Sequence, residues 1–386
     1  MTSPEKKRKR KKQSLNPNPS LPDDLVLSII ARVSRLYYPT LSLVSKSFRS
    51  MLASPELYKA RSLLGRKESC LYLCVKMNHS CRWFTLCRKP DKTLTSDTSE
   101  KKKSNSYVLA KVPIPYSPDA NFSSLVAVGS NIYNIGISES RFKAFSSTVS
   151  VLDCTSHTWR KAPSLLVEPF TLSASVLDQK IYVAGSYIDD DDSKFLKNSF
   201  EVFDTRTQVW DLESMPHSVV EDKSFTNSAC IDENIHVMAG SRLVAYNPKE
   251  GRWDNMVPQP AMMSTYVCSY SRCEIDNVSY CFSNGNIKWY DTEVRRWKIL
   301  KGLVGLPKFS LGGWVGLADY GGKMAVLWEE NSIYGCSFLY KKLIWCAEIS
   351  LERRKSCEIR GKVEWFDHLL RVSMTSYLGK VLVATV

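Results

Sequence analysis

Apolar residues recur at helical spacing in the segment 21–65. Leu25, Ile29 and Val33 are four residues apart, which places them along one face of a helix. Pro22 and the two acids that follow it favour a helix N-terminus. The pattern therefore predicts that a helix starts close to Pro22.

Further short helices are predicted after this one. The dipeptide Tyr38-Pro39 is expected to break the first helix, because the residue before a proline is disfavoured in the α region. Ser54 followed by Pro55 is typical of another helix start. Gly65 marks the expected end of the cluster. A second apolar series at helical spacing consists of Leu41, Val44, Phe48 and Leu52.

From residue 66 onward the pattern changes to short alternating segments separated by turn residues, which predicts β-strands. A repeated motif runs through them, in which an Asp or Asn is followed six positions later by Trp. The Asx side chain can accept hydrogen bonds from amides in a hairpin turn, and the Trp can pack against a neighbouring unit. The pairs are Asp153 and Trp159, Asp204 and Trp210, Asn247 and Trp253, and Asp291 and Trp297. A fifth, shorter copy is expected at Leu339-Tyr340…Trp345, with Lys341 at the Asx position.

Each copy of the motif predicts a unit of four strands, and units of this kind repeating about every 45–50 residues indicate a β-propeller. We expect six blades over residues 66–386. The predicted whole repeats are 122–163, 170–216, 225–257, 265–303 and 312–350. The sixth blade is expected to be split, with a hairpin from 69–88 and a hairpin from 366–386 closing the ring and removing open sheet edges.

Composition and charge narrow the class of protein. The chain has 386 residues, 44% of them hydrophobic, which suffices for a large core. The formal net charge is +14, and a large share lies in residues 1–20, which we expect to be a disordered basic tail. Three interpretations of the tail stay open: a nuclear localisation signal, non-specific phosphate binding, or a solvated tail with neither role. Its basic run is Lys6, Lys7, Arg8, Lys9, Arg10, Lys11 and Lys12.

Several functional classes are excluded by what the sequence lacks. No apolar run reaches the roughly 20 residues of a membrane helix, and no secretory signal follows the basic start. The twelve cysteines form no CxxC pair, so we expect thiols and no zinc site. No phosphate-binding loop or nucleophile elbow occurs. The five histidines are scattered, which argues against a redox copper centre and an oxidase: His79, His157, His217, His236 and His368.

The helical segment resembles an F-box, and the strand repeats resemble kelch repeats. The F-box resemblance rests on Leu21-Pro22-Asp23-Asp24, on Val44-Ser45-Lys46 and on Phe48-Arg49. The kelch resemblance is looser, since single glycines replace the usual Gly-Gly pair and Ser283 stands there in the fourth unit. Over roughly residues 20–386 the chain resembles a plant F-box/kelch-repeat protein. The single glycines are Gly136, Gly185 and Gly240.

The resemblance implies a substrate-recognition subunit of a Skp–cullin–F-box ubiquitin ligase. In this family the F-box binds a Skp-type adaptor, and through it a cullin–RING ligase, while the propeller binds the protein to be ubiquitinated. It implies no catalysis and no cofactor. An excess of apolar residues over what a small helical cluster can bury also marks an interface. The expected adaptor-binding residues are Leu21, Pro22, Leu25, Ile29, Ile30, Leu41, Val44, Phe48 and Leu52.

The substrate is expected at the loops on one rim of the propeller, and its identity is not indicated. The loop residues Asp189, Asp190, Asp191 and Asp192 are either a contact for a basic partner or a solvated acidic loop. Four consecutive acids do not match a calcium loop. The alternative function is a nuclear protein- or nucleic-acid-binding propeller that acts without the ligase. The expected compartment is the nucleus, the cytoplasm or both.

Overall fold

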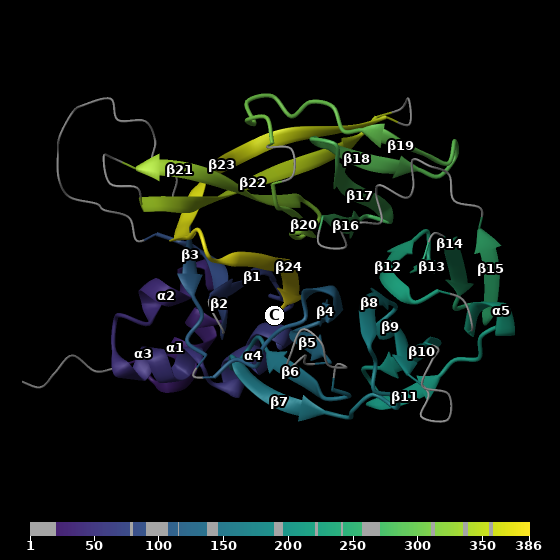
Figure 1. The fold of residues 1–386 in the computed structure, drawn as a ribbon. Coiled ribbons are helices and arrows are strands. Elements are labelled where there is room, and N and C mark those ends of the chain that lie inside the picture. The colour runs from purple at the N-terminus through teal and green to yellow at the C-terminus, as the bar shows by residue number, and fades with distance from the viewer. Residues whose placement is uncertain are drawn as a thin grey trace, which may run out of the picture.

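The computed structural model shows six four-stranded antiparallel sheets arranged around an axis, with a helical module (residues 21–65) attached to one side (Figure 1). This confirms the predicted six-bladed propeller preceded by helices. The described residues are 21–77, 80–89, 107–114, 116–136, 146–188, 196–220, 223–240, 242–256, 271–309, 313–334, 339–354 and 358–386.

The helical module begins with α1, whose two N-terminal acids favour the positive end of the helix dipole. Ser45 and Ser54 cap the next longer helices, because their hydroxyl groups accept hydrogen bonds from the amides of Phe48 and Leu57. The helices are α1 (Asp23–Ile30), the 3-10 helix η1 (Arg35–Tyr37), α2 (Tyr38–Leu41), α3 (Lys46–Leu52) and α4 (Pro55–Leu63).

The predicted helix break at Tyr38-Pro39 was wrong. The first helix already ends at Ile30, and Tyr38-Pro39 starts α2, where a proline in the first turn costs no hydrogen bond. The second apolar series is also interrupted, since Ser42–Ser45 separate α2 from α3. The module buries a small core of its own, made of Ile30, Ala31, Tyr38, Leu52 and Leu57.

The first four whole blades follow the predicted repeats. Two short helices, η2 (Phe122–Ser124) and α5 (His217–Val220), lie between strands. The blades are β4 (Leu125–Val128), β5 (Asn131–Ile135), β6 (Val149–Asp153) and β7 (Thr158–Ala162); β8 (Thr171–Leu177), β9 (Lys180–Ile188), β10 (Leu196–Asp204) and β11 (Val209–Leu212); β12 (Phe225–Ile231), β13 (Asn234–Ala239), β14 (Arg242–Asn247) and β15 (Arg252–Met256); and β16 (Arg272–Ile275), β17 (Val278–Ser283), β18 (Asn286–Asp291) and β19 (Arg296–Ile299).

The Asx–Trp motif forms the hairpin between the third and fourth strands of these blades. Asp153 Oδ1 accepts a hydrogen bond of 2.7 Å from the amide of Thr155, and the other three Asx side chains cap their turns in the same way. The ring of Trp253 lies 4.8 Å from that of Phe200 in the preceding blade. Trp210 donates its Nε1–H to the carbonyl oxygen of Pro163, which directly follows the last strand of the preceding blade. Both predicted roles of the motif are thereby confirmed.

The fifth predicted repeat, 312–350, was wrong in its extent. Trp345 lies inside the third strand of the blade instead of on its fourth strand. The last three strands of this blade are unusually long, so the last hairpin comes after residue 350, and the Asx–Trp alignment therefore fails. The blade consists of β20 (Val315–Asp319), β21 (Met324–Tyr334), β22 (Leu339–Arg353) and β23 (Ile359–Ser373).

The closing blade is split between the two ends of the domain, but not into two hairpins. Residues 366–373 belong to β23, so the C-terminal part contributes one strand and the N-terminal part three. Strand β3 follows a polar stretch and was not predicted. The order across the sheet is β24 (Tyr377–Thr385), β1 (Ser69–Met77), β2 (Ser80–Arg88) and β3 (Tyr107–Lys111).

The first strands of most neighbouring sheets contact one another around the axis, and the chain ends near the centre (Figure 1). Successive strands within a blade are antiparallel. The 1–2 and 3–4 turns of every blade consequently lie on one face of the propeller. The 2–3 loops and the blade-to-blade connections lie on the other face. We call these the turn face and the loop face.

Candidate functional site

The predicted adaptor-binding residues fall into three groups in the structure. Ile30 and Leu52 are buried in the core of the helical module. Leu41 and Phe48 are half-buried against that core. The remaining residues are exposed on the described surface: Leu21, Pro22, Leu25, Ile29 and Val44.

The exposed residues along α1 follow the helix geometry. Leu25 and Ile29 lie one turn apart and are 53% and 54% exposed, and Leu21 just before the helix is 58% exposed. Ile30 points to the opposite side and is 2% exposed. Large apolar side chains exposed in a row are unusual on a surface that needs no partner.

A second exposed apolar pair lies in the turn between α2 and α3. Leu43 is 73% exposed and Val44 is 62% exposed. Leu43 was not predicted as a site residue, because it falls outside the helical spacing of its neighbours. The signal that would have found it is the apolar pair itself, placed in a polar turn between Ser42 and Ser45. We call Leu21, Pro22, Leu25, Ile29, Leu43 and Val44 the exposed apolar group.

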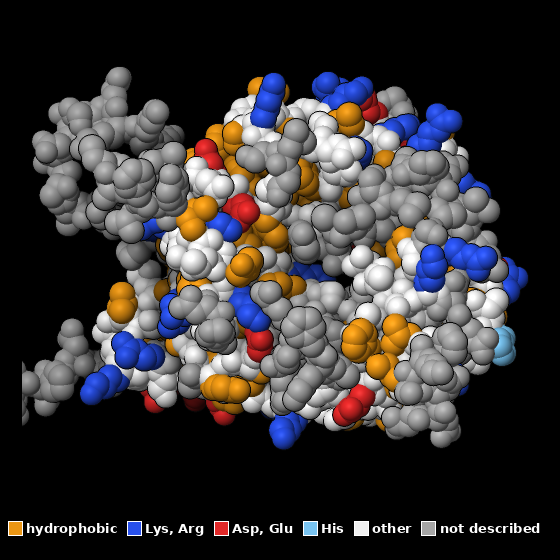
Figure 2. All heavy atoms as spheres, in the orientation of Figure 1, with side chains coloured by type: hydrophobic (Ala, Val, Ile, Leu, Met, Phe, Trp, Pro, Cys, Tyr) orange, Lys and Arg blue, Asp and Glu red, His pale blue; other side chains and the backbone are white. Residues whose placement is uncertain are grey.

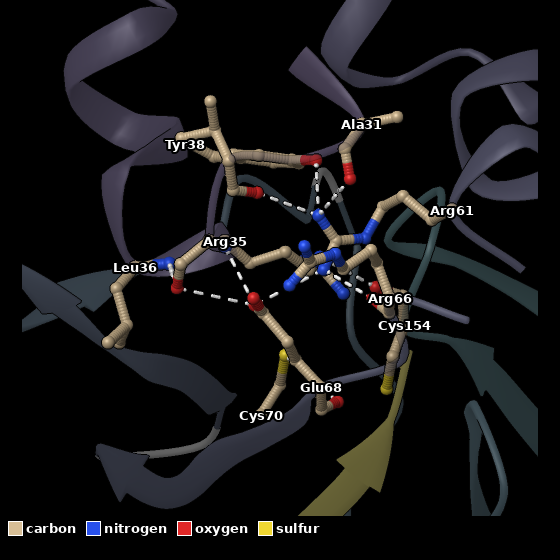
Figure 3. Close-up of polar contacts among 11 residues, drawn as sticks. Ala31, Arg35, Leu36, Tyr38, Arg61, Arg66, Glu68, Cys70 and Cys154 are labelled. Atoms are coloured by element: carbon tan, nitrogen blue, oxygen red, sulfur yellow. Dashed lines mark hydrogen bonds and ion pairs between the residues drawn. The ribbon is translucent and has the colours of Figure 1, made fainter. Parts of the chain in front are cut away.

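The buried Arg61 of α4 joins the helices to the segment that enters the propeller (Figure 3). Its side chain is almost fully buried and donates to the carbonyl oxygens of Val33 at 2.7 Å and Arg66 at 2.8 Å. It also donates to the hydroxyl group of Tyr38. Its Nη2 lies 3.3 Å from Oε2 of Glu68, which balances its charge. Removing one partner of such a buried ion pair is strongly destabilising, because the other charge stays buried without a partner.

Glu68 also holds the helical module against the propeller. Its carboxylate accepts a hydrogen bond of 2.8 Å from the amide of Arg35, and its backbone pairs with that of the C-terminal Val386. The Arg35 guanidinium donates to the carbonyl oxygen of Cys154, in the β6–β7 turn of the first whole blade, at 3.0 Å. The module is thus fixed to the propeller by contacts from several elements (Figure 3).

The connectivity places the helical module on the turn face. The chain leaves α4 and enters β1, whose beginning lies at the 1–2 end of the closing blade. Thr155 and His157 of a 3–4 turn and Gly321 of a 1–2 turn line the same junction. The loop face, where the described ends of the β9–β10 connection are Ile188 and Leu196, lies opposite. The acidic residues 189–192 lie outside the described residues.

Basic side chains are spread around the visible face of the molecule and do not gather in one patch (Figure 2). The basic run at residues 6–12 lies outside the described residues. Of the described histidines, His157 and His236 are separated in the fold, and burial lowers the pKa of each to about 4. The described residues contain no group of three or more His, Cys, Asp or Glu side chains suited to a metal ion. None of the described helices is long and apolar enough to cross a membrane.

Comparisons with known proteins match both parts of the chain. An F-box domain model matches residues 19–60, and a model described as FKB95, Kelch-repeats domain matches residues 83–370. The F-box/kelch-repeat protein At5g51250 of Arabidopsis thaliana is 59% identical over 95% of this chain and 99% of its own length. The F-box/kelch-repeat protein At4g39550 of the same plant is 52% identical over 97% of each chain. The putative F-box/kelch-repeat protein At5g38680 is 53% identical over 96% of each chain. With these matches, the chain belongs to the F-box/kelch-repeat protein family.

Proposed function

We propose that this protein is the substrate-recognition subunit of a Skp–cullin–F-box ubiquitin ligase. The F-box binds a Skp-type adaptor, and the propeller binds the protein to be ubiquitinated. The observation that carries the proposal is the exposed apolar group on the F-box. The propeller leaves this group uncovered, although burying it would be favourable at about 25 cal/mol for each Å² of apolar surface.

The division of the propeller into two faces supports the same function. Because the F-box occupies the turn face, an adaptor and a substrate can be bound at the same time. The loop face carries 2–3 loops and blade-to-blade connections of different lengths, and such loops on a rigid scaffold are suited to recognition. The protein then acts by proximity: it raises the effective concentration of a substrate lysine near the ubiquitin-conjugating enzyme and performs no chemistry of its own.

A co-purification experiment tests the proposal. Full-length protein carrying Leu25→Asp and Ile29→Asp should lose at least about tenfold in the amount of Skp-type adaptor retained, because carboxylates would replace apolar contacts. Both positions are exposed, so the fold should be unaffected. The matched control is Val294→Asp, an apolar residue on the propeller that is 50% exposed. It should retain the adaptor like the wild type.

Two results would count against the proposal. One is a wild-type protein that retains no Skp-type adaptor, which would favour a propeller that works independently of the ligase. The other is equal retention by the wild type and the double variant, which would place the adaptor elsewhere on the chain.

A further inference from the structure

The junction between the F-box and the propeller contains a partly open cavity of about 740 Å³. It lies among η1, the N-terminal part of the closing blade and two turns of the turn face. This volume falls within the range of about 300–1,000 Å³ that is typical of small-molecule sites, which often lie between domains. Its apolar walls include Leu36, Leu52, Leu86, Val112 and Tyr320.

The wall of the cavity includes Arg35, whose guanidinium group has no carboxylate partner among the described residues. Arg35 lines the cavity, and its Nη1 is buried without a hydrogen-bond partner among the described residues. Its other terminal nitrogen donates to a backbone carbonyl, and its charge is flanked by the rings of Tyr38 and Tyr58 at 5.9 and 5.3 Å. An arginine buried in this way normally pairs with an anion.

The charges around the cavity do not balance. Glu68 is the one acid among the described residues that line it, and its carboxylate is already paired with the buried Arg61. Arg49 and Lys111 also line the cavity and add positive charge. Burial lowers the pKa of His157 to about 4 and raises that of Cys87 to about 12, so both are neutral near pH 7. The lining therefore carries a net positive charge.

We propose that this cavity binds a small organic anion, with its acidic group on Arg35 and an apolar body against the walls. This site is separate from the exposed apolar group and from the loop face, and it goes beyond the proposed ligase function. The basic N-terminal tail does not fit as the occupant, because its lysines and arginines would be repelled by Arg35. A ligand bound here would touch both domains and would stabilise their arrangement.

Isothermal titration calorimetry with two isosteric probes tests the proposal on the full-length protein. Naphthalene-1-sulfonate carries an anionic group on an apolar body, and naphthalene-1-sulfonamide is its neutral counterpart. The wild type should bind one sulfonate per chain, at least about tenfold more tightly than the sulfonamide, because only the sulfonate forms a charged pair with Arg35. The sulfonate should also raise the melting temperature.

Two variants assign the binding to the cavity. Arg35→Gln should abolish the preference for the sulfonate over the sulfonamide. Ala110→Phe, which fills the cavity from β3 without changing its charge, should weaken the binding of both probes by at least about tenfold. The matched control is Arg206→Gln, which changes an exposed arginine in the β10–β11 turn and should bind both probes like the wild type.

The proposal is overturned if the wild type shows no saturable binding of the sulfonate. It is also overturned if the preference for the sulfonate survives in Arg35→Gln, or if Ala110→Phe binds both probes unchanged. If Arg35→Gln does not fold, the comparison of probe binding by the wild type and by Ala110→Phe tests the proposal alone. These outcomes are independent of adaptor binding, which depends on other residues.

Discussion

At the scale of single residues, the F-box depends on one buried cation. Arg61 is 1% exposed and donates hydrogen bonds to carbonyl oxygens in the segments after α1 and after α4. A pattern of apolar spacing does not reveal such a residue, because its partners are brought together only by the tertiary fold. The same limit applies to α1, where Ile29 is exposed and its neighbour Ile30 is buried. The sequence shows that both residues are apolar, but it does not show which of them packs against the rest of the module.

Replacing Arg61 should destabilise the F-box more than the propeller. Arg61→Met leaves backbone carbonyls and Glu68 without their partner, and we expect a loss of about 3 kcal/mol in the unfolding free energy of the helices. Helical circular dichroism during urea unfolding measures it. Because every Trp lies beyond residue 65, Trp fluorescence reports the propeller separately. Arg32→Met, at an exposed position after α1, is the control and should change little. Unchanged helical unfolding in Arg61→Met would refute this role.

At the scale of elements, the Asx–Trp hairpin explains which blades can be predicted from the sequence and which cannot. Where the hairpin has its regular length, the Asx cap and the Trp are both visible in the sequence, and four blades were predicted from them. In the fifth blade the long strands β22 and β23 displace the hairpin. In the closing blade, β24 and β1 come from opposite ends of the domain, so no local repeat marks their pairing.

The same hairpin contains a position at which glycine should increase the stability of the protein. The residue four places after the Asx is left-handed in all four hairpins, with φ values from 50° to 61°, but only Gly251 is a glycine there. Arg295→Gly should raise the unfolding free energy by about 1 kcal/mol, because a left-handed conformation costs a non-glycine residue that much. Gly251→Arg should lower it by a similar amount. Urea unfolding followed by Trp fluorescence measures both changes.

The control for this pair lies one residue further along. Arg296 is in the regular strand β19, where glycine is unfavourable by about 0.5–1 kcal/mol, so Arg296→Gly should destabilise the protein. Destabilisation by Arg295→Gly as well would show that the backbone conformation does not limit the stability of this turn.

At the scale of the whole molecule, the two domains leave two surfaces free for partners. The F-box covers part of the turn face through the contacts of Arg35 and Glu68, while its exposed apolar group and the loop face stay open. The net charge of +14 bears on location more than on binding, since basic side chains are scattered over the face shown in Figure 2 and a seven-residue basic run lies at residues 6–12.

This charge distribution predicts that the tail directs nuclear import. Deleting residues 1–14 from a fluorescently tagged protein should abolish its nuclear accumulation, because the deletion removes the longest Lys/Arg run in the sequence. A control with the seven basic residues replaced by Gln should behave like the deletion, and microscopy compares both with the wild type. Nuclear accumulation that persists in both variants would show that the tail is not the signal.

We expect the exposed apolar group of the F-box to be the adaptor-binding surface and the loop face to stay free for a substrate. Hydrogen–deuterium exchange of the purified protein, with and without a Skp-type adaptor, measures this most directly. We expect slower exchange in α1 and in the turn at Ser42–Ser45 when the adaptor is bound, and no change at the ends of β9 and β10 around Ile188 and Leu196. Protection at the loop face, or none in α1 and this turn, would contradict it.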